Sequence, residues 1–265
     1  MLASIAGLAL ATPALAQSNF WVSQANTASW FTNGNWSLNE PPNAGTDAIF
    51  DGRTGVVVPY QVNVPFQGAA ARRLIIQSPR TIRYVFAPDV GVGLTLGATD
   101  TTAAPSLTLG TAANGPIIAS FERATTPSGS PQTFVTGSRG VLGSVVGSNA
   151  SLEVRSQGMR LNLSNRLSIG LSGAGTFKAT SGGRLDTPTM LLGINAAGTG
   201  EVEVSGTASR VNISGVVGAP NDVIIGDAGA GKFSILNSGA LTSDTLGTRG
   251  LNNVGQIGLT PLGED

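Results

Sequence analysis

The sequence predicts an all-β chain folded as a right-handed parallel β-helix (a β-solenoid) with an aromatic-rich N-terminal cap. One phrase recurs between residues 167 and 239: an apolar pair followed by Gly, a short turn of small residues, a second Gly and an alternating strand. Glycine accounts for 37 of 265 residues and charged residues for only 11%, compared with about a quarter in an average domain. No stretch shows the i, i+3, i+4, i+7 apolar spacing of an amphipathic helix.

The repeat is anchored by Gly170, Gly193 and Gly226, and a fourth anchor is expected at Gly258. The intervals between these anchors fall within the period of about 20 to 50 residues that is typical of solenoids. Each unit holds three short strands and forms one rung, the coil of chain that adds a strand to each sheet. A rung cannot fold alone, because its few buried side chains contribute about 1.5–3 kcal/mol each, while ordering each residue costs about 1–2 kcal/mol. Neighbouring rungs must therefore stack.

Alternation along the strands predicts which side chains face the interior, because successive residues of a strand point to opposite faces. The anchor glycines lie where the chain turns between strands, so we expect positive φ there. Ile225, next to one anchor, is expected to point inward. The other residues predicted to point inward are Leu152, Val154, Phe177, Ala179, Val202, Val204, Phe233 and Ile235.

The segment 1–16 reads as a secretory signal peptide. Its residues are apolar and small, and it ends in Ala14-Leu15-Ala16, the small-x-small pattern of a signal-peptidase site. It is too short to span a bilayer comfortably, so the mature chain is expected to begin at Gln17 without a membrane-spanning segment. No Lys or Arg precedes the apolar stretch, and a buried helix is the alternative.

Residues 17–55 differ from the rest of the chain in composition, because they hold every Trp: Trp21, Trp30 and Trp36. Aromatic residues at one end of a repeat stack suit a cap that covers the exposed edge of the first rung. The alternative is a carbohydrate-binding module in which these three rings stack on sugars. The dipeptide at residues 33–34, Asn-Gly, is a strong signal for a hairpin turn.

Residues 56–148 predict irregular rungs with projecting loops, including a loop at 125–131. Strands are expected at 56–58, 60–64, 74–76 and 81–86, and residues 94–97 and 107–110 are two short copies of the anchor phrase.

Residues 149–265 predict the regular rungs, and residues 251–265 begin another repeat and then stop. We therefore expect a chain truncated at its C-terminus, which frays from about Thr245 or associates with itself end to end.

Composition removes several classes of chemistry. The chain has no Cys and no His, which excludes thiolate nucleophiles, Ser-His-Asp triads and the usual zinc sites. A net charge of zero gives no bulk attraction to nucleic acid or to an anionic membrane. The glycine-rich stretches match neither a phosphate loop nor a dinucleotide site, and residues 181–186 do not fit the calcium nonapeptide. No cofactor, metal or nucleic-acid partner is expected.

Two carboxylates, Glu201 and Glu203, form a candidate catalytic pair, since parallel β-helices host polysaccharide lyases and hydrolases. Both side chains lie on one face of a strand, and the rise of a strand over two residues places them about 6.5–7 Å apart. This separation suits an inverting glycosidase. The preferred interpretation is a solvated outer face, because Val202 and Val204 take the inward positions.

The repeats resemble those of type V secretion (autotransporter) passengers and of proteins carrying the PEP-CTERM sorting signal. The resemblance rests on GTFKATSGGRL at 175–185, GEVEVSG at 200–206 and the aromatic opening at 30–50, although Leu171, Ile194 and Asp227 stand where the family has Asn after the anchor Gly. It implies a secreted or outer-membrane-associated surface solenoid, structural or adhesive and without catalytic activity. The implied partners are surface glycans or components of host or neighbouring cells. A polysaccharide-active enzyme and a carbohydrate-binding module are the alternatives.

Overall fold

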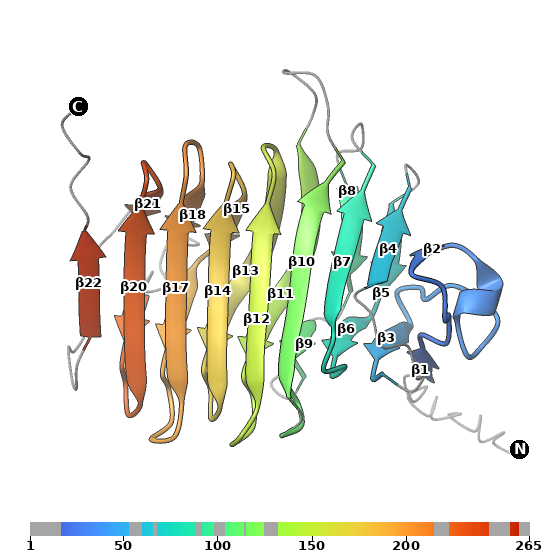
Figure 1. Ribbon diagram of the computed structural model, residues 1–265, viewed down its shortest axis with the longest axis horizontal. Helices are drawn as coiled ribbons and strands as arrows, with labels where there is room; N and C mark the ends of the chain where they lie inside the picture. Colours follow the sequence, from blue (N-terminus) through green and yellow to red (C-terminus); the bar gives the residue numbers. More distant parts are fainter. Residues whose placement is uncertain are drawn as a thin grey trace, which may run out of the picture.

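The computed structural model describes residues 17–52, 60–65, 68–87, 92–97, 104–113, 115–124, 132–214, 223–243 and 255–259. These residues are nearly all β, and their strands form two parallel sheets of many strands. Figure 1 shows the strands standing side by side, from β2 near one end of the stack to β22 near the other. This architecture is compatible with the predicted β-solenoid.

The nine-stranded sheet takes one strand from each rung. Each strand pairs in parallel with the next, which lies one rung further along the chain. In order, the strands are β2 (Thr27–Ser29), β4 (Tyr60–Val64), β7 (Thr81–Phe86), β10 (Pro116–Arg123), β12 (Asn149–Arg155), β14 (Ala174–Thr180), β17 (Thr199–Ser205), β20 (Ala230–Leu236) and β22 (Gly255–Leu259).

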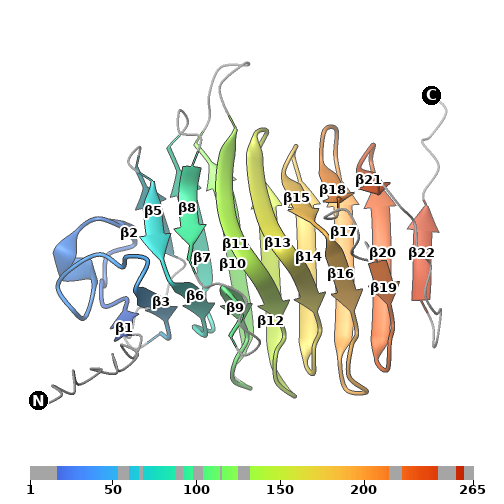
Figure 2. The same cartoon turned by 180° about the vertical axis from the view of Figure 1, so that it is seen from behind.

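The 13-stranded sheet lies behind the nine-stranded sheet in the view of Figure 1 and faces the viewer in Figure 2. Its long strands β11 and β13 bend, with a register shift between Gly137 and Arg139, so their two halves pair with different short strands. From β10 to β19 each rung thus contributes three strand segments, as predicted. The strands are β1 (Gln17–Phe20), β3 (Thr46–Phe50), β5 (Ala69–Ala71), β6 (Arg73–Ile76), β8 (Val92–Leu96), β9 (Leu107–Leu109), β11 (Thr133–Leu142), β13 (Met159–Ile169), β15 (Arg184–Thr187), β16 (Thr189–Leu192), β18 (Arg210–Ile213), β19 (Val223–Ile225) and β21 (Ala240–Ser243).

The core consists of columns of apolar side chains that repeat from rung to rung. Leu152, Phe177, Val202 and Phe233 lie in register on four consecutive strands and are almost fully buried. Of the residues predicted to point inward, Ile235 is half-buried and all the others are buried. The inward register read from the sequence is therefore confirmed.

The anchor glycines adopt the left-handed backbone conformation that was predicted for them. The φ angles are 69° at Gly170, 61° at Gly193 and 69° at Gly226, a region that glycine enters without steric penalty. A Cβ on Gly170 would also lie 2.2 Å from the carbonyl oxygen of Thr199 on the next rung. The anchors are therefore glycine both for their φ angle and for the close stacking of rungs.

The hairpin predicted at residues 33–34 is wrong. The segment Asn33–Asn35 forms a 3-10 turn, η1, and neither Asn33 nor Gly34 has the positive φ that a two-residue hairpin turn needs. The indole nitrogen of Trp36 donates to the carbonyl oxygen of Trp30 at 2.7 Å. This buried contact fixes Trp36 against Trp30 and overrides the local turn preference of the exposed residues Asn33 and Gly34.

The fourth anchor predicted at Gly258 is also wrong. Residues 255–259 form β22 and extend the nine-stranded sheet, where Gly255 pairs with Gly231 and Ile257 with Phe233. The alternation from Gly255 onward matches the strand phrase, so Gly258 stands within a strand.

Between residues 111 and 148, the long strands β10 and β11 continue both sheets. The predicted signal peptide, the strand at 56–58, the loop at 125–131 and the point of fraying at Thr245 lie outside the described residues.

Candidate functional site

The three Trp side chains proposed to stack on sugars are buried. Trp21, Trp30 and Trp36 are 2%, 0% and 2% exposed. The ring centroids of Trp21 and Trp36 lie 5.0 Å apart, and that of Phe50 lies 5.2 Å from Trp21. These rings are therefore packed against one another, and none presents a face to solvent on which a sugar could stack.

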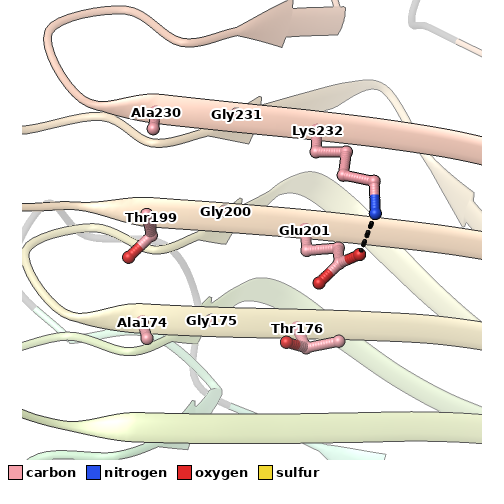
Figure 3. Close-up of a pocket in the computed structure, with 9 residues that line it drawn as sticks. All are labelled: Ala174, Gly175, Thr176, Thr199, Gly200, Glu201, Ala230, Gly231 and Lys232. Atoms are coloured by element: carbon pink, nitrogen blue, oxygen red, sulfur yellow. Dashed lines mark hydrogen bonds and ion pairs between the residues drawn. The ribbon is translucent and has the colours of Figure 1, made fainter. Parts of the chain in front are cut away.

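The pair Glu201 and Glu203 lies on one outer face of β17, as predicted, and each carboxylate is neutralised. Glu201 Oε1 is 2.8 Å from the ammonium of Lys232 on β20, and Glu203 Oε2 is 3.1 Å from that of Lys178 on β14. Figure 3 shows the first pair beside a shallow groove of about 390 Å³ lined by small residues. Both carboxylates are therefore held in ion pairs between neighbouring strands. The arrangement is that of a charge ladder between strands.

Glu122 extends this pattern toward the N-terminus. Its carboxylate is contacted by Arg83 at 2.7 Å, by Arg155 at 3.2 Å and by the hydroxyl of Ser120 at 2.7 Å. Burial raises the pKa of Glu122, but the hydrogen bonds from Arg83 and Ser120 and the charges of both arginines outweigh it, so the pKa lies below its usual value. Four cations of this sheet therefore contact a carboxylate of a neighbouring strand: Arg83, Arg155, Lys178 and Lys232.

Asp47 forms a similar ionic centre in the other sheet. Its carboxylate is 1% exposed and accepts two hydrogen bonds each from Arg72 and Arg73. Burial raises the pKa of Asp47, yet the two guanidinium groups bring it below the usual value. Because Asp47 pairs in register with Arg73, the centre ties β3 to β6.

Further along the 13-stranded sheet, three arginines are stacked on one another. Arg160, Arg184 and Arg210 occupy one position on β13, β15 and β18, since Arg160 pairs in register with Arg184 and Arg184 with Arg210. Arg160 and Arg184 are half-buried and Arg210 is exposed. We call this column the arginine ladder.

A polar column runs beside the ladder, two positions further along each strand. Asn162, Asp186 and Asn212 lie in register there. The amide of Asn212 donates to Asp186 Oδ1 at 3.1 Å, and the hydroxyl of Thr242 donates to Asn212 Oδ1 at 2.8 Å. Asn162 and Asp186 line a shallow groove of about 430 Å³ at the bend of the sheet. The ladder therefore borders a groove lined with hydroxyl, amide and carboxylate groups.

The ladder holds more positive than negative charge. Asp186 is its one ionic partner within the described residues, 3.6 Å from Arg160. Neither Arg184 nor Arg210 makes a salt bridge or a side-chain hydrogen bond with the described part of the chain. Burial and the charges of Arg160 and Arg210 lower the pKa of Arg184. The three guanidinium groups thus repel one another without full compensation.

Further cations lie across the bend, where Arg139 and Arg166 pair in register on the second halves of β11 and β13. Several buried polar atoms in this region have no hydrogen-bond partner among the described residues. They are Arg139 Nε, Arg160 Nε, Arg166 Nε, Asn162 Oδ1 and Asp186 Oδ2.

The arginine ladder was missed in the sequence, because a net charge of zero conceals its segregation onto one sheet. A signal was present. The motif Arg-apolar-Asn/Asp occurs at positions 160–162, 184–186 and 210–212, once in each of three successive rungs. Strand alternation places both polar side chains of each copy on one face, so a search for charges that recur at the rung period would have found the column.

Comparisons with protein-family models, with curated proteins and with solved structures found no match to this chain. Within the described residues, no helix has the length and apolar character needed to cross a membrane. The same residues contain no cluster of three or more Asp or Glu side chains arranged to bind a metal ion.

Proposed function

We propose that the chain is a structural and adhesive β-solenoid of the cell exterior, comparable to an autotransporter passenger and without catalytic activity. The observation that carries the proposal is the continuous register of the core column Leu152, Phe177, Val202 and Phe233. Successive rungs devote the same positions to stacking, as a stalk requires. The arginine ladder supplies the adhesive face, because its charges are not matched within the described part of the chain.

We further propose that the solenoid is right-handed and that the aromatic cluster caps its first rung. Crossover connections between parallel strands of one sheet are right-handed in about 98% of cases. Trp21, Trp30 and Trp36 pack on Phe50. The neighbouring strands β1, β2 and β3 lie at one end of the stack (Figure 1). The burial of the Trp rings supports a cap, because the rings cover apolar surface that the first strands would otherwise expose.

Export through the segment 1–16 completes the proposal. Expression of the whole sequence in a bacterial host, followed by cell fractionation and mass spectrometry, tests it. We expect a product that begins at Gln17 and is found outside the cytoplasm. A cytoplasmic product that retains the segment 1–16 would contradict the assignment.

The non-catalytic role is tested separately. The purified mature protein is incubated with neutral and uronate polysaccharides, and the release of new reducing ends or unsaturated products is followed. We expect none, because Glu201 and Glu203 are held as ion pairs with Lys232 and Lys178. Product formation that is lost in Glu201→Gln would establish the glycoside-cleaving alternative.

A further inference from the structure

We infer that the arginine ladder binds a linear polyuronate, a polysaccharide that carries one carboxylate on each sugar residue. The inference rests on the proposed function and names the ligand class of its adhesive face. Arg160, Arg184 and Arg210 would each pair with a carboxylate of the same polymer chain.

The spacing of the ladder supports a regular polymer. Adjacent strands lie about 4.7–4.9 Å apart, and the in-register pairing of Arg160, Arg184 and Arg210 repeats one guanidinium group at that interval. An extended polyuronate presents its carboxylates at a comparable interval along its axis. Arginine also suits this ligand, because its planar fork donates two parallel hydrogen bonds to one carboxylate.

The polar column beside the ladder explains why the ligand is a sugar. Asn162 and Asp186 line the groove at the bend together with the hydroxyl-bearing residues Thr136, Ser164 and Thr187. Amide, carboxylate and hydroxyl groups of this kind are the usual hydrogen-bond partners of sugar hydroxyls.

The electrostatic state of the free protein points the same way. The half-buried Arg184 lies between two other arginines in register, and like charges in directly opposed positions are destabilising. A polymer carboxylate at each rung would relieve this repulsion. On the nine-stranded sheet the equivalent relief comes from the chain itself, through Glu122, Glu201 and Glu203.

Calorimetric titration of the mature protein with an oligogalacturonate long enough to span three strands tests the inference. We expect saturable binding that weakens with salt, and a loss of about ten-fold or more in affinity for Arg184→Gln. The matched control is Lys178→Gln, which removes one positive charge from the other sheet and should leave affinity within about two-fold. Arg184→Lys should bind with intermediate affinity, because it keeps the charge and loses the fork.

Two further ligands identify what is recognised. The methyl-esterified oligogalacturonate keeps the sugar backbone and loses the charge, and we expect it not to bind. Tighter binding of single-stranded DNA than of the uronate, equal binding of the ester, or an unchanged affinity in Arg184→Gln would each overturn the inference. Circular dichroism and the melting temperature establish that each variant is folded, and Arg210→Gln, at an exposed position, provides a second variant.

The same titration separates this inference from the proposed function. Binding without cleavage supports both. Binding with cleavage supports the ligand class and contradicts the non-catalytic role. Failure of the uronate to bind overturns the ligand class alone, because the stalk architecture does not depend on it.

Discussion

The carboxylate of Glu122 accepts hydrogen bonds from both Nε and Nη2 of Arg83, at 3.1 and 2.7 Å, across two neighbouring strands. The two residues are 39 positions apart in the chain and are brought together by the stacking of rungs. The glutamate side chain is 7% exposed and the arginine 44%. The pair therefore joins a buried anion to a partly hydrated cation. Losing the arginine would leave a buried carboxylate without this partner, whereas losing the glutamate would leave a guanidinium group that water can still solvate.

Glu122→Gln tests this ionic centre. Its removal should destabilise the protein by roughly 1.5–3 kcal/mol at neutral pH, the range for hydrogen bonds that involve a charged group. Arg83 and Arg155 keep access to water, which limits the loss. Denaturant midpoints of the variant and the wild type provide the measurement, and an unchanged midpoint would show that the centre contributes nothing to stability.

Acid should weaken the wild type more than this variant. The pKa of Glu122 in the folded protein lies below the ordinary value of 4.5. The stabilisation is therefore fully present above pH 4.5 and is lost as the pH falls through the depressed folded pKa. Asp47 acts in the same direction from its ordinary value of 3.8. A stability curve that is equally steep for Glu122→Gln and the wild type in this acidic range would contradict the assignment.

Gly170→Ala should be severely destabilising. The φ angle of 69° is in the left-handed region, and the new Cβ would lie 2.2 Å from the carbonyl oxygen of Thr199. The backbone strain alone costs about 1–2 kcal/mol, and the clash forces two rungs apart. Gly34→Ala is the matched control, because nothing lies within 4 Å of a Cβ there and φ is not positive. Equal melting temperatures for the two variants would show that the rungs do not approach this closely.

Phe177→Ala should destabilise the stack by about 3–5 kcal/mol, as is usual for removal of a buried aromatic ring. Its column neighbours Leu152 and Val202 are in register above and below it, so the cavity opens within the core. Glu203→Ala, on the opposite face, should cost at most about 1 kcal/mol. A reversed order of denaturation midpoints would show that the inward register is displaced by one residue.

The regular rungs could be predicted from the sequence because they depend on local rules. Alternation fixed the inward positions of Phe177 and Val202, and the glycines at 170, 193 and 226 mark turns that only glycine enters easily. The errors at Asn33 and Gly258 have another origin. In both cases packing outweighed a short local signal. The first was overridden by the hydrogen bond from Trp36 to Trp30, six residues away, and the second by pairing with the distant strand β20.

The candidate site was harder to predict because it exists only across rungs. Arg160 and Arg210 are far apart in the chain and become second neighbours through pairing with Arg184. Neither the net charge nor a local motif reveals this arrangement. Strand register, which depends on the lengths of the intervening loops, decides whether equal charges stack or alternate.

Arg184→Gln should raise the stability of the free protein. Arg184 lies in register with Arg160 on one side and Arg210 on the other, and it makes no salt bridge within the described residues. Removing the central charge relieves two repulsions, and we expect a gain of about 0.2–1 kcal/mol, the range for cross-strand pairs. Lys178→Gln should lower stability, because it breaks the 3.1 Å ion pair with Glu203. Added salt screens repulsion, so it should stabilise the wild type more than Arg184→Gln. Urea midpoints at low and high ionic strength measure both effects. A loss of stability in Arg184→Gln that salt does not change would show that Arg184 supports the fold through packing, and the ladder would then lack the unrelieved charge on which ligand binding depends.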